Sequence, residues 1–175
     1  AAQMAKAGWY SKLVNAGFVK QQAAVVPQIA GVMLIDSRPT VRKYDVGHIQ
    51  TAVNIPDSMF DKLAPTLLPA DKSTLLVFYC GGLECMLSHN SAFKAEKLGY
   101  TNIKVYPAGS PEWKAKGGPI SVSAAYVKKL MDEKAAYALI DARPKRVADK
   151  GMIPTASNIS DTEFDKQVDK LPADK

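Results

Sequence analysis

An internal repeat restricts the fold of this chain more than any other feature of its sequence. Three segments return 103 to 105 residues further along, and 19 of their 26 positions are identical. The segment pairs are 35–39 with 140–144, 47–62 with 151–166, and 68–72 with 171–175. Because the offset changes by only one residue from each pair to the next, the pattern indicates a duplicated unit. The chain is therefore expected to contain two related domains.

The two copies differ in the chemistry that they can carry. The first copy continues past residue 72 into a stretch that holds both cysteines of the chain, Cys80 and Cys85. A counterpart of Cys80 would be residue 183, whereas the sequence ends at Lys175. We therefore expect the second copy to lack a catalytic cysteine. We also expect it either to pack on the first copy or to need further chain that completes it.

The segment Gly117-Gly118-Pro119 marks the boundary between the copies, because glycine and proline are typical of connections. This boundary predicts a first domain of residues 1–118, which has an N-terminal helical extension and includes the loop with the cysteines. It predicts a partial second domain of residues 119–175.

Short apolar runs alternate with helical patterns, which predicts an α/β fold with a parallel sheet flanked by helices. The expected strands are Val32–Asp36, Ala52–Ile55, Thr74–Cys80, Ile103–Tyr106 and Tyr137–Asp141, and the expected helices are Met4–Ala16, Ser88–Leu98 and Ser123–Lys134. The run Thr74–Cys80 is apolar on both of its alternating faces. Such a run is typical of a central parallel strand that is covered on two sides.

Several single residues are expected to lie at the ends of these elements. Ser88 or Ser91 is the expected N-cap of the helix after the cysteines, and Gly99 is its expected stop. Ser123 is the expected N-cap of the helix in the second copy. Pro65 is expected to lie in a turn between elements.

The composition excludes several classes of protein. With 47% hydrophobic and 23% charged residues, the chain has a globular composition rather than that of a largely disordered protein. It has no apolar run long enough to span a membrane as a helix. Its net charge of +6 is spread along the chain, without a block of five like charges. Nucleic acid is therefore not expected as a partner, whereas small anions suit the charge.

The start of the sequence bears on location. The chain begins Ala1-Ala2-Gln3 without an initiator methionine, as it would after removal of a signal peptide or cleavage of a tag. We expect a periplasmic or otherwise exported bacterial protein, with a cytoplasmic location as the alternative.

Cys80 stands where the expected central strand ends and the next helix has not yet begun. Ligands of an open parallel sheet bind at this edge. Gly81 and Gly82 allow backbone N–H groups to turn inward, and the positive end of the helix favours a thiolate, which is the reactive form of cysteine. The position therefore indicates that Cys80 is a nucleophile, with a buried structural cysteine as the alternative.

Five motifs of the first copy resemble the rhodanese family in their order and spacing. They are Leu34–Arg38, Tyr44–Pro56, Val77–Cys80, Lys97–Tyr100 and Gly109–Trp113. The resemblance covers about residues 18–118 as one complete module and residues 120–175 as the start of another. The chain thus resembles a tandem rhodanese protein with a truncated second domain. The resemblance implies a rhodanese-like parallel sheet flanked by helices.

The resemblance also implies a sulfurtransferase. A rhodanese cysteine, here Cys80, accepts a sulfane sulfur from a donor such as thiosulfate, a polysulfide or a protein persulfide. It holds this sulfur as a persulfide and passes it to a thiol or another nucleophilic acceptor. Backbone N–H groups of the loop would stabilise the persulfide, and the residues concerned are Gly81, Gly82, Leu83, Glu84, Cys85 and Met86. The resemblance implies no metal and no organic cofactor.

The loop departs from the family pattern. It has no basic residue between Cys80 and Lys94, and it is about two residues longer than the common form. A phosphatase of this fold would need an arginine where the chain has Met86, so phosphatase activity is disfavoured. The missing basic residues disfavour thiosulfate and favour a polysulfide or a protein-borne persulfide at an apolar mouth.

Cys85 has two interpretations. It could approach Cys80 and resolve a persulfide to a disulfide with release of sulfide, or it could fill the core and never react. A non-catalytic rhodanese-like module that binds a partner or senses redox state, and a dithiol redox protein, are therefore alternatives to the transferase. Cys80, Cys85 and His89 lack a fourth ligand and match no zinc pattern, so a metal site is not expected.

Other polar residues are expected to hold the fold rather than to react. Asp36 and Arg38 recur in the copy without a cysteine, which favours a structural network. His48 is expected to pack after a turn, Glu84 to face solvent, and Trp113 to cap the core.

Overall fold

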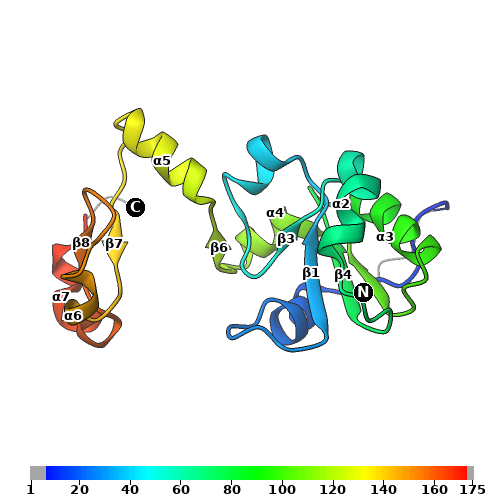
Figure 1. Ribbon diagram of the computed structural model, residues 1–175, viewed down its shortest axis with the longest axis horizontal. Coiled ribbons are helices and arrows are strands. Elements are labelled where there is room, and N and C mark those ends of the chain that lie inside the picture. Colours follow the sequence, from blue (N-terminus) through cyan, green and yellow to red (C-terminus); the bar gives the residue numbers. More distant parts are fainter. Residues whose placement is uncertain (1–6, 173–175) are drawn as a thin grey trace. The chain divides into compact units, whose positions relative to one another are not determined.

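The computed structural model describes residues 7–172 of the chain (Figure 1). It has two compact units, the first ending at Val127 and the second beginning at Lys128. Within residues 7–172, no helix combines the length and the apolar character that crossing a membrane requires.

The first unit is built on a four-stranded parallel sheet with the strand order β3-β1-β4-β5. The strands are β1 (Val32–Asp36), β3 (Val53–Asn54), β4 (Leu75–Tyr79) and β5 (Ile103–Tyr106). β4 lies inside the sheet, with Val77 paired to Leu34 of β1 and to Lys104 of β5. Its residues from Leu76 onward are fully buried. The predicted α/β fold with a central, doubly covered strand is therefore confirmed.

Alternating side chains of β1 and β4 build one apolar layer on each face of the sheet. Ile35 and Phe78 pack in a layer with Phe60 and Ala92 from the helices α2 (Phe60–Leu67) and α3 (Leu87–Lys97). These two helices lie side by side (Figure 1). The opposite layer holds Leu34, Val77 and Tyr79, and it is covered by α1 (Ala16–Phe18), η1 (Val19–Ala23) and α4 (Gly109–Ala115). Both faces of the sheet are thus shielded from water.

Short elements complete the first unit. They are the π-helical segments η1 and η2 (Thr40–Tyr44), the 3-10 turn η3 (Asp57–Met59), and the antiparallel pair of strands β2 (His48–Ile49) and β6 (Ile120–Ser121). α5 (Ala124–Asp132) follows, and Ser123 caps it as predicted, since its Oγ accepts a hydrogen bond from the Tyr126 N–H at 3.1 Å.

The predicted helix Met4–Ala16 is wrong over its described part. Residues 4–6 lie outside the described residues, and residues 7–15 are not helical. Instead, Leu13 forms a parallel bridge with Val105, and the Val14 N–H donates to the Val105 carbonyl at 2.8 Å. β5 is an edge strand with unpaired backbone groups, and this segment satisfies them. Helical geometry begins only at Ala16.

Two further local predictions are wrong. Neither Ser88 nor Ser91 caps α3, because the cap position is Met86 and both serine side chains are directed to other partners, Cys80 and Asp57. Pro65 lies inside α2 rather than in a turn. A proline near the end of a short helix removes only one intrahelical hydrogen bond, which the packing of Phe60 and Ala64 offsets.

Gly99 ends α3 as predicted. Its φ of +89° lies in the left-handed region, which favours glycine.

The second unit contains the parallel strand pair β7 (Ile140–Asp141) and β8 (Ser157–Asn158). Around this pair lie α6 (Lys145–Ala148), η4 (Asp161–Glu163), α7 (Phe164–Gln167) and η5 (Val168–Lys170).

The same hydrogen-bonded arrangement occurs in both units. An arginine pairs with the aspartate at the end of the first strand and donates to a glycine carbonyl, while an asparagine amide of the neighbouring strand donates to the carbonyls of both charged residues. The matching residues are Asp36, Arg38, Gly47 and Asn54 in the first unit and Asp141, Arg143, Gly151 and Asn158 in the second. Thr51 and Thr155 share a positive φ, 70° and 72°. The repeat therefore extends to backbone geometry.

Candidate active site

The loop between β4 and α3, residues 80–86, lies at the carboxyl edge of the parallel sheet. The start of α4 holds it in place, because the Ser110 N–H donates to the Cys80 carbonyl at 3.1 Å. Gly109 has a φ of +56°, and a Cβ there would come within 2.3 Å of the Cys80 carbonyl oxygen. Only glycine allows this close approach of the two backbones. The structure thus confirms the prediction that Cys80 lies between the central strand and the helix that follows it.

The Cys80 side chain is completely buried. Its Sγ donates to the Cys85 carbonyl oxygen at 3.2 Å and lies 3.2 Å from the Ser88 Oγ. The hydrogen bond to Cys85 and the burial of the thiol raise the pKa of Cys80 above its ordinary value. The assignment of Cys80 as the nucleophile stays a prediction, and the structure places its sulfur in surroundings that favour the thiol over the thiolate.

The Cys85 side chain is half-buried and has the opposite surroundings. Interactions with the thiol of Cys80, with the backbone N–H groups of Gly81 and Leu87 and with the positive charge of Arg38 lower the pKa of Cys85 to about 6. Both cysteines are free thiols. Of the loop amides that were expected to face Cys80, the amide of Gly81 favours a negative charge on Cys85.

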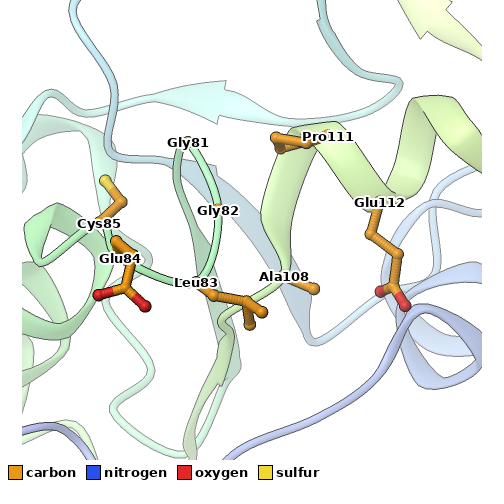
Figure 2. Close-up of a pocket in the computed structure, with 8 residues that line it drawn as sticks. All are labelled: Gly81, Gly82, Leu83, Glu84, Cys85, Ala108, Pro111 and Glu112. Atoms are coloured by element: carbon orange, nitrogen blue, oxygen red, sulfur yellow. The ribbon is translucent and has the colours of Figure 1, made fainter.

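An open pocket of about 620 Å³ lies along the outer side of the loop (Figure 2). Five of the six residues predicted to bind substrate line it, namely Gly81, Gly82, Leu83, Glu84 and Cys85. Pro111 and Ala108 form the facing wall (Figure 2). Met86 and Cys80 are not among the lining residues.

A second open pocket of about 480 Å³ meets the loop at Cys85 and Gly81. Four basic side chains line this pocket, Arg38, Arg42, Lys43 and Lys114, and no acidic side chain does. Arg38 is paired with Asp36, whose carboxylate lies 2.6 Å away, whereas the part of the chain that the structure describes offers no ion pair to the other three. Other elements thus supply at this pocket the positive charge that the loop lacks, whereas no basic side chain lines the first pocket, and Met86 lines neither of the two.

Comparison with known proteins bears directly on this arrangement. The sequence model of the rhodanese-like domain matches residues 10–116, which include the whole sheet and the cysteine loop. The chain belongs to the rhodanese-like family. Family membership supports sulfur transfer as the general class of chemistry for this loop.

One curated protein is similar to this chain in sequence. The chain is 34% identical over 94 residues to the HTH-type transcriptional regulator Rv0324 of Mycobacterium tuberculosis, and the match covers 53% of this chain and 39% of that protein. The chain thus spans well under half the length of this curated relative.

Two solved structures share the fold at low sequence identity. The 3-mercaptopyruvate sulfotransferase SseA from Escherichia coli superimposes with a TM-score of 0.54 and 16% identity, over 86% of this chain and 75% of that one. The Alr3790 protein from Anabaena sp. gives a TM-score of 0.54 and 21% identity, over 69% of this chain and 90% of that one.

The four basic residues that line the second pocket, Arg38, Arg42, Lys43 and Lys114, form the basic wall of the rhodanese-like site. The sequence analysis assigned no role in the site to the last three of them. Arg42 and Lys43 lie in η2, which follows β1, and Lys114 lies in α4, which follows β5. β1 and β5 flank β4, so the segments after all three strands meet at one edge of the sheet. That rule of parallel sheets is the signal that could have indicated these residues.

Other residues singled out in the sequence have structural partners. The ring of His48 stacks on Tyr44 with centroids 3.7 Å apart, and its Nδ1 lies 2.8 Å from the Tyr44 carbonyl oxygen. Trp113 is buried and donates to the Pro119 carbonyl at 3.0 Å. Glu84 is exposed, as expected. These positions agree with the predicted structural roles.

His89 is buried on α3, where its Nδ1 accepts a hydrogen bond from the Tyr10 N–H at 3.1 Å. Burial lowers its pKa. Within residues 7–172, no three metal-ligating side chains come together, and this holds for the trio of His89, Cys80 and Cys85.

Proposed function

We propose that this chain is a sulfurtransferase that accepts a sulfane sulfur from a small anionic donor and holds it as a persulfide in the Cys80–Cys85 loop. One observation carries the proposal: two free thiols lie at the carboxyl edge of the central strand, and one of them opens into a pocket lined by basic side chains. The acceptor in the second half of the reaction is a thiol or another nucleophile, including one on a protein.

The donors considered are thiosulfate, a polysulfide and a protein persulfide. With thiosulfate, a cysteine thiolate attacks the sulfane sulfur, the S–S bond of the donor breaks, and its electron pair leaves with sulfite. The enzyme then carries a persulfide anion. Arg42, Lys43 and Lys114 favour a donor with negative charge, because unpaired cations raise the local concentration of anions. The basic wall therefore supports thiosulfate as well as polysulfide.

A direct test measures the mass of the intact protein after incubation with thiosulfate or polysulfide and capping of free thiols and persulfides. We expect the added mass of one sulfur atom on the wild-type protein and its loss on treatment with cyanide or glutathione. A double variant, Cys80→Ser with Cys85→Ser, is expected to take up no sulfur. Absence of the adduct on the wild-type protein with every donor would overturn the proposal.

A redox-sensing or binding module is the second candidate, and two free thiols in one short loop favour it, with the Cys80 Sγ 3.2 Å from the Cys85 carbonyl oxygen. This candidate predicts that mild oxidation consumes both thiols without any sulfur donor. The transferase predicts uptake of sulfur under reducing conditions, where such a disulfide cannot persist.

We also propose that the chain is a tandem rhodanese-like protein, with its first copy in residues 1–118 and part of a second copy in residues 119–175. The sequence repeat and the shared Asp–Arg–Asn arrangement support this.

A further inference from the structure

We propose that the face around the cysteine loop is a docking surface for an acidic partner protein, whose cysteine thiol takes the sulfur from the loop. This inference rests on the proposed sulfur transfer and specifies its acceptor. The docking surface is formed by η2 and the segment after it, by the tip of the loop and by α4, and its members are Arg42, Lys43, Val46, Leu83, Pro111 and Lys114.

The docking surface carries positive charge that the fold does not neutralise. Arg42, Lys43 and Lys114 are exposed, and all three line the second pocket. Among residues 7–172, no acidic side chain forms an ion pair with any of them. Cations that gather in this way at one place attract an acidic partner and speed its association.

Exposed apolar side chains lie beside this charge. Leu83 is 48% exposed at the first pocket, and Val46 is 40% exposed at the second. Pro111 lines both pockets and lies across the first one from the loop (Figure 2). Protein interfaces combine apolar contacts with charged groups at their rim. A site for a small inorganic anion alone has no need of exposed apolar side chains.

The size of the open space also favours a large partner. The pockets of about 620 and 480 Å³ adjoin the same loop, and Gly81, Cys85 and Pro111 line both of them. Thiosulfate, with its five heavy atoms at about 30 Å³ each, takes up about 150 Å³. It therefore fills only about a third of the smaller pocket, and the side chains of a docked protein can occupy the rest.

The acidic residues near the loop determine how the partner is oriented. Glu84 and Glu112 line the first pocket, where no basic side chain does. One carboxylate oxygen of Glu112 lies 3.3 Å from the Lys116 ammonium, and the other accepts a hydrogen bond from the Tyr106 hydroxyl at 2.7 Å. The positive charge is thus confined to the side of η2. The acidic groups of the partner bind there, and its apolar side chains cover the tip of the loop.

The geometry of η2, which holds two of the three cations, is a further feature of this face. η2 is π-helical, a rare geometry that is frequent at functional sites. The matching segment of the second unit is α6, an ordinary α-helix. Gly47 follows Pro39 by eight positions, whereas Gly151 follows Pro144 by seven. The additional residue is therefore found in the unit that holds the cysteines.

The transfer step balances without a further reactant. The sulfur of the partner's cysteine attacks the outer sulfur of the loop persulfide, the S–S bond breaks, and its electron pair stays on the loop cysteine. In total, the proton of the partner's thiol passes to the loop cysteine, and the partner leaves with a persulfide anion. Cations beside the loop reduce the repulsion between the two sulfur atoms as negative charge develops on them.

Binding of synthetic peptides tests the docking surface without any sulfur chemistry. Two fluorescent peptides of equal length contain one serine and one leucine among either glutamates or lysines, and anisotropy measures their affinity for the full chain. At low salt we expect the glutamate peptide to bind more than about tenfold more tightly, because two or more charges contribute. This difference is expected to disappear at about 1 M salt. Equal binding of the peptides would overturn the inference. Binding of a single-stranded oligonucleotide but not of the glutamate peptide would overturn it in favour of nucleic acid.

Matched variants locate the binding on the chain. Arg42→Ala with Lys43→Ala removes two charges of the docking surface and is expected to weaken binding of the glutamate peptide about tenfold. Lys20→Ala with Lys97→Ala removes two exposed charges outside both pockets and is expected to leave this binding unchanged. Equal losses for the two double variants would show that net charge alone decides, against the inference. Circular dichroism checks that each variant folds.

Sulfur transfer separates this inference from the proposed function. The protein is loaded from thiosulfate, freed of the donor and mixed with the same peptides carrying cysteine in place of serine. We expect the Arg42→Ala, Lys43→Ala double variant to pass sulfur to the glutamate peptide about tenfold more slowly than the wild type, and to the lysine peptide no more slowly. Slower loading with unchanged transfer would assign the cations to the donor alone and overturn the inference. If the wild-type protein takes up no sulfur, the proposed function fails, whereas the binding of the serine peptides still decides on the docking surface.

Discussion

The reactivity of Cys85 gives the most detailed prediction. Its pKa, lowered to about 6, means that the thiolate forms above this pH and is lost as the pH falls through it. At pH 7 roughly 90% of Cys85 is then ionised, against roughly 3% of an ordinary thiol with a pKa near 8.5. Because nucleophilicity falls with pKa, the alkylation rate at pH 7 differs by only about twofold. The midpoint of the pH profile is therefore the quantity to measure.

The assay follows iodoacetamide alkylation of each cysteine between pH 4 and 10, with the peptides separated after cleavage at Glu84. We expect a midpoint for Cys85 near 6 and almost no labelling of Cys80 in the native protein. Cys80→Ala removes the hydrogen-bond donor and is expected to move the midpoint upward by about 1 unit or more, since this bond is the largest cause of the shift. Cys80→Ser should restore most of it. A wild-type midpoint near 8.5, or faster labelling of Cys80 than of Cys85, would refute the reasoning.

Three other predictions concern the basic wall, the loop and the core. Lys114→Ala is expected to raise the KM for thiosulfate about fivefold, as expected for the loss of one charge near 4 Å in water. Lys116→Ala, at the C-cap of the same helix and outside the pocket, is expected to leave this KM unchanged, and equal effects of the two variants in steady-state kinetics would contradict the prediction. Gly109→Ala is expected to cost about 2–4 kcal/mol of unfolding free energy in urea, because it combines a positive φ with a clash against Cys80. The control is Gly117→Ala, because Gly117 has a positive φ but open space around it, and this change is expected to cost about 1 kcal/mol of unfolding free energy. Similar losses of unfolding free energy for the two variants would count against a role for the clash with Cys80. Tyr79→Phe removes a hydroxyl that donates to Asp36 at 2.7 Å and accepts from the Ile49 N–H at 3.0 Å. Thermal unfolding is expected to show a loss of about 1–3 kcal/mol in the free energy of unfolding. Tyr137→Phe, at an exposed site, is expected to change this free energy little.

Much of the sheet could be predicted from local pattern. β4 and β1 are short apolar runs with turn residues at their ends. Because β4 is buried on both faces, its apolar run is continuous, and such a run is easily recognised in the sequence. The prediction of a helix over Met4–Ala16 failed because residues 12–14 pair with β5. The spacing of apolar residues in this segment does not reveal a contact with residues so distant in the sequence. Pro65 failed for a related reason, since tertiary packing of α2 outweighs the preference of proline for turns.

The candidate site could be located from the sequence, but the surroundings of its two sulfur atoms could not be predicted. A cysteine between a buried strand and a helix indicates the loop, which the structure confirms. Burial of the Cys80 sulfur and the opening of Cys85 into a pocket depend on the backbone conformation of residues 80–87, which no spacing rule determines. The charges of Arg42, Lys43 and Lys114 come from segments far from the loop in sequence.

Electron density for crystals soaked in thiosulfate shows directly whether the cysteine loop takes up sulfur. We expect an additional sulfur bonded at about 2.05 Å to a cysteine sulfur of the Cys80–Cys85 loop. Unmodified density at both cysteines in protein shown to be reduced and accessible would contradict sulfur transfer itself.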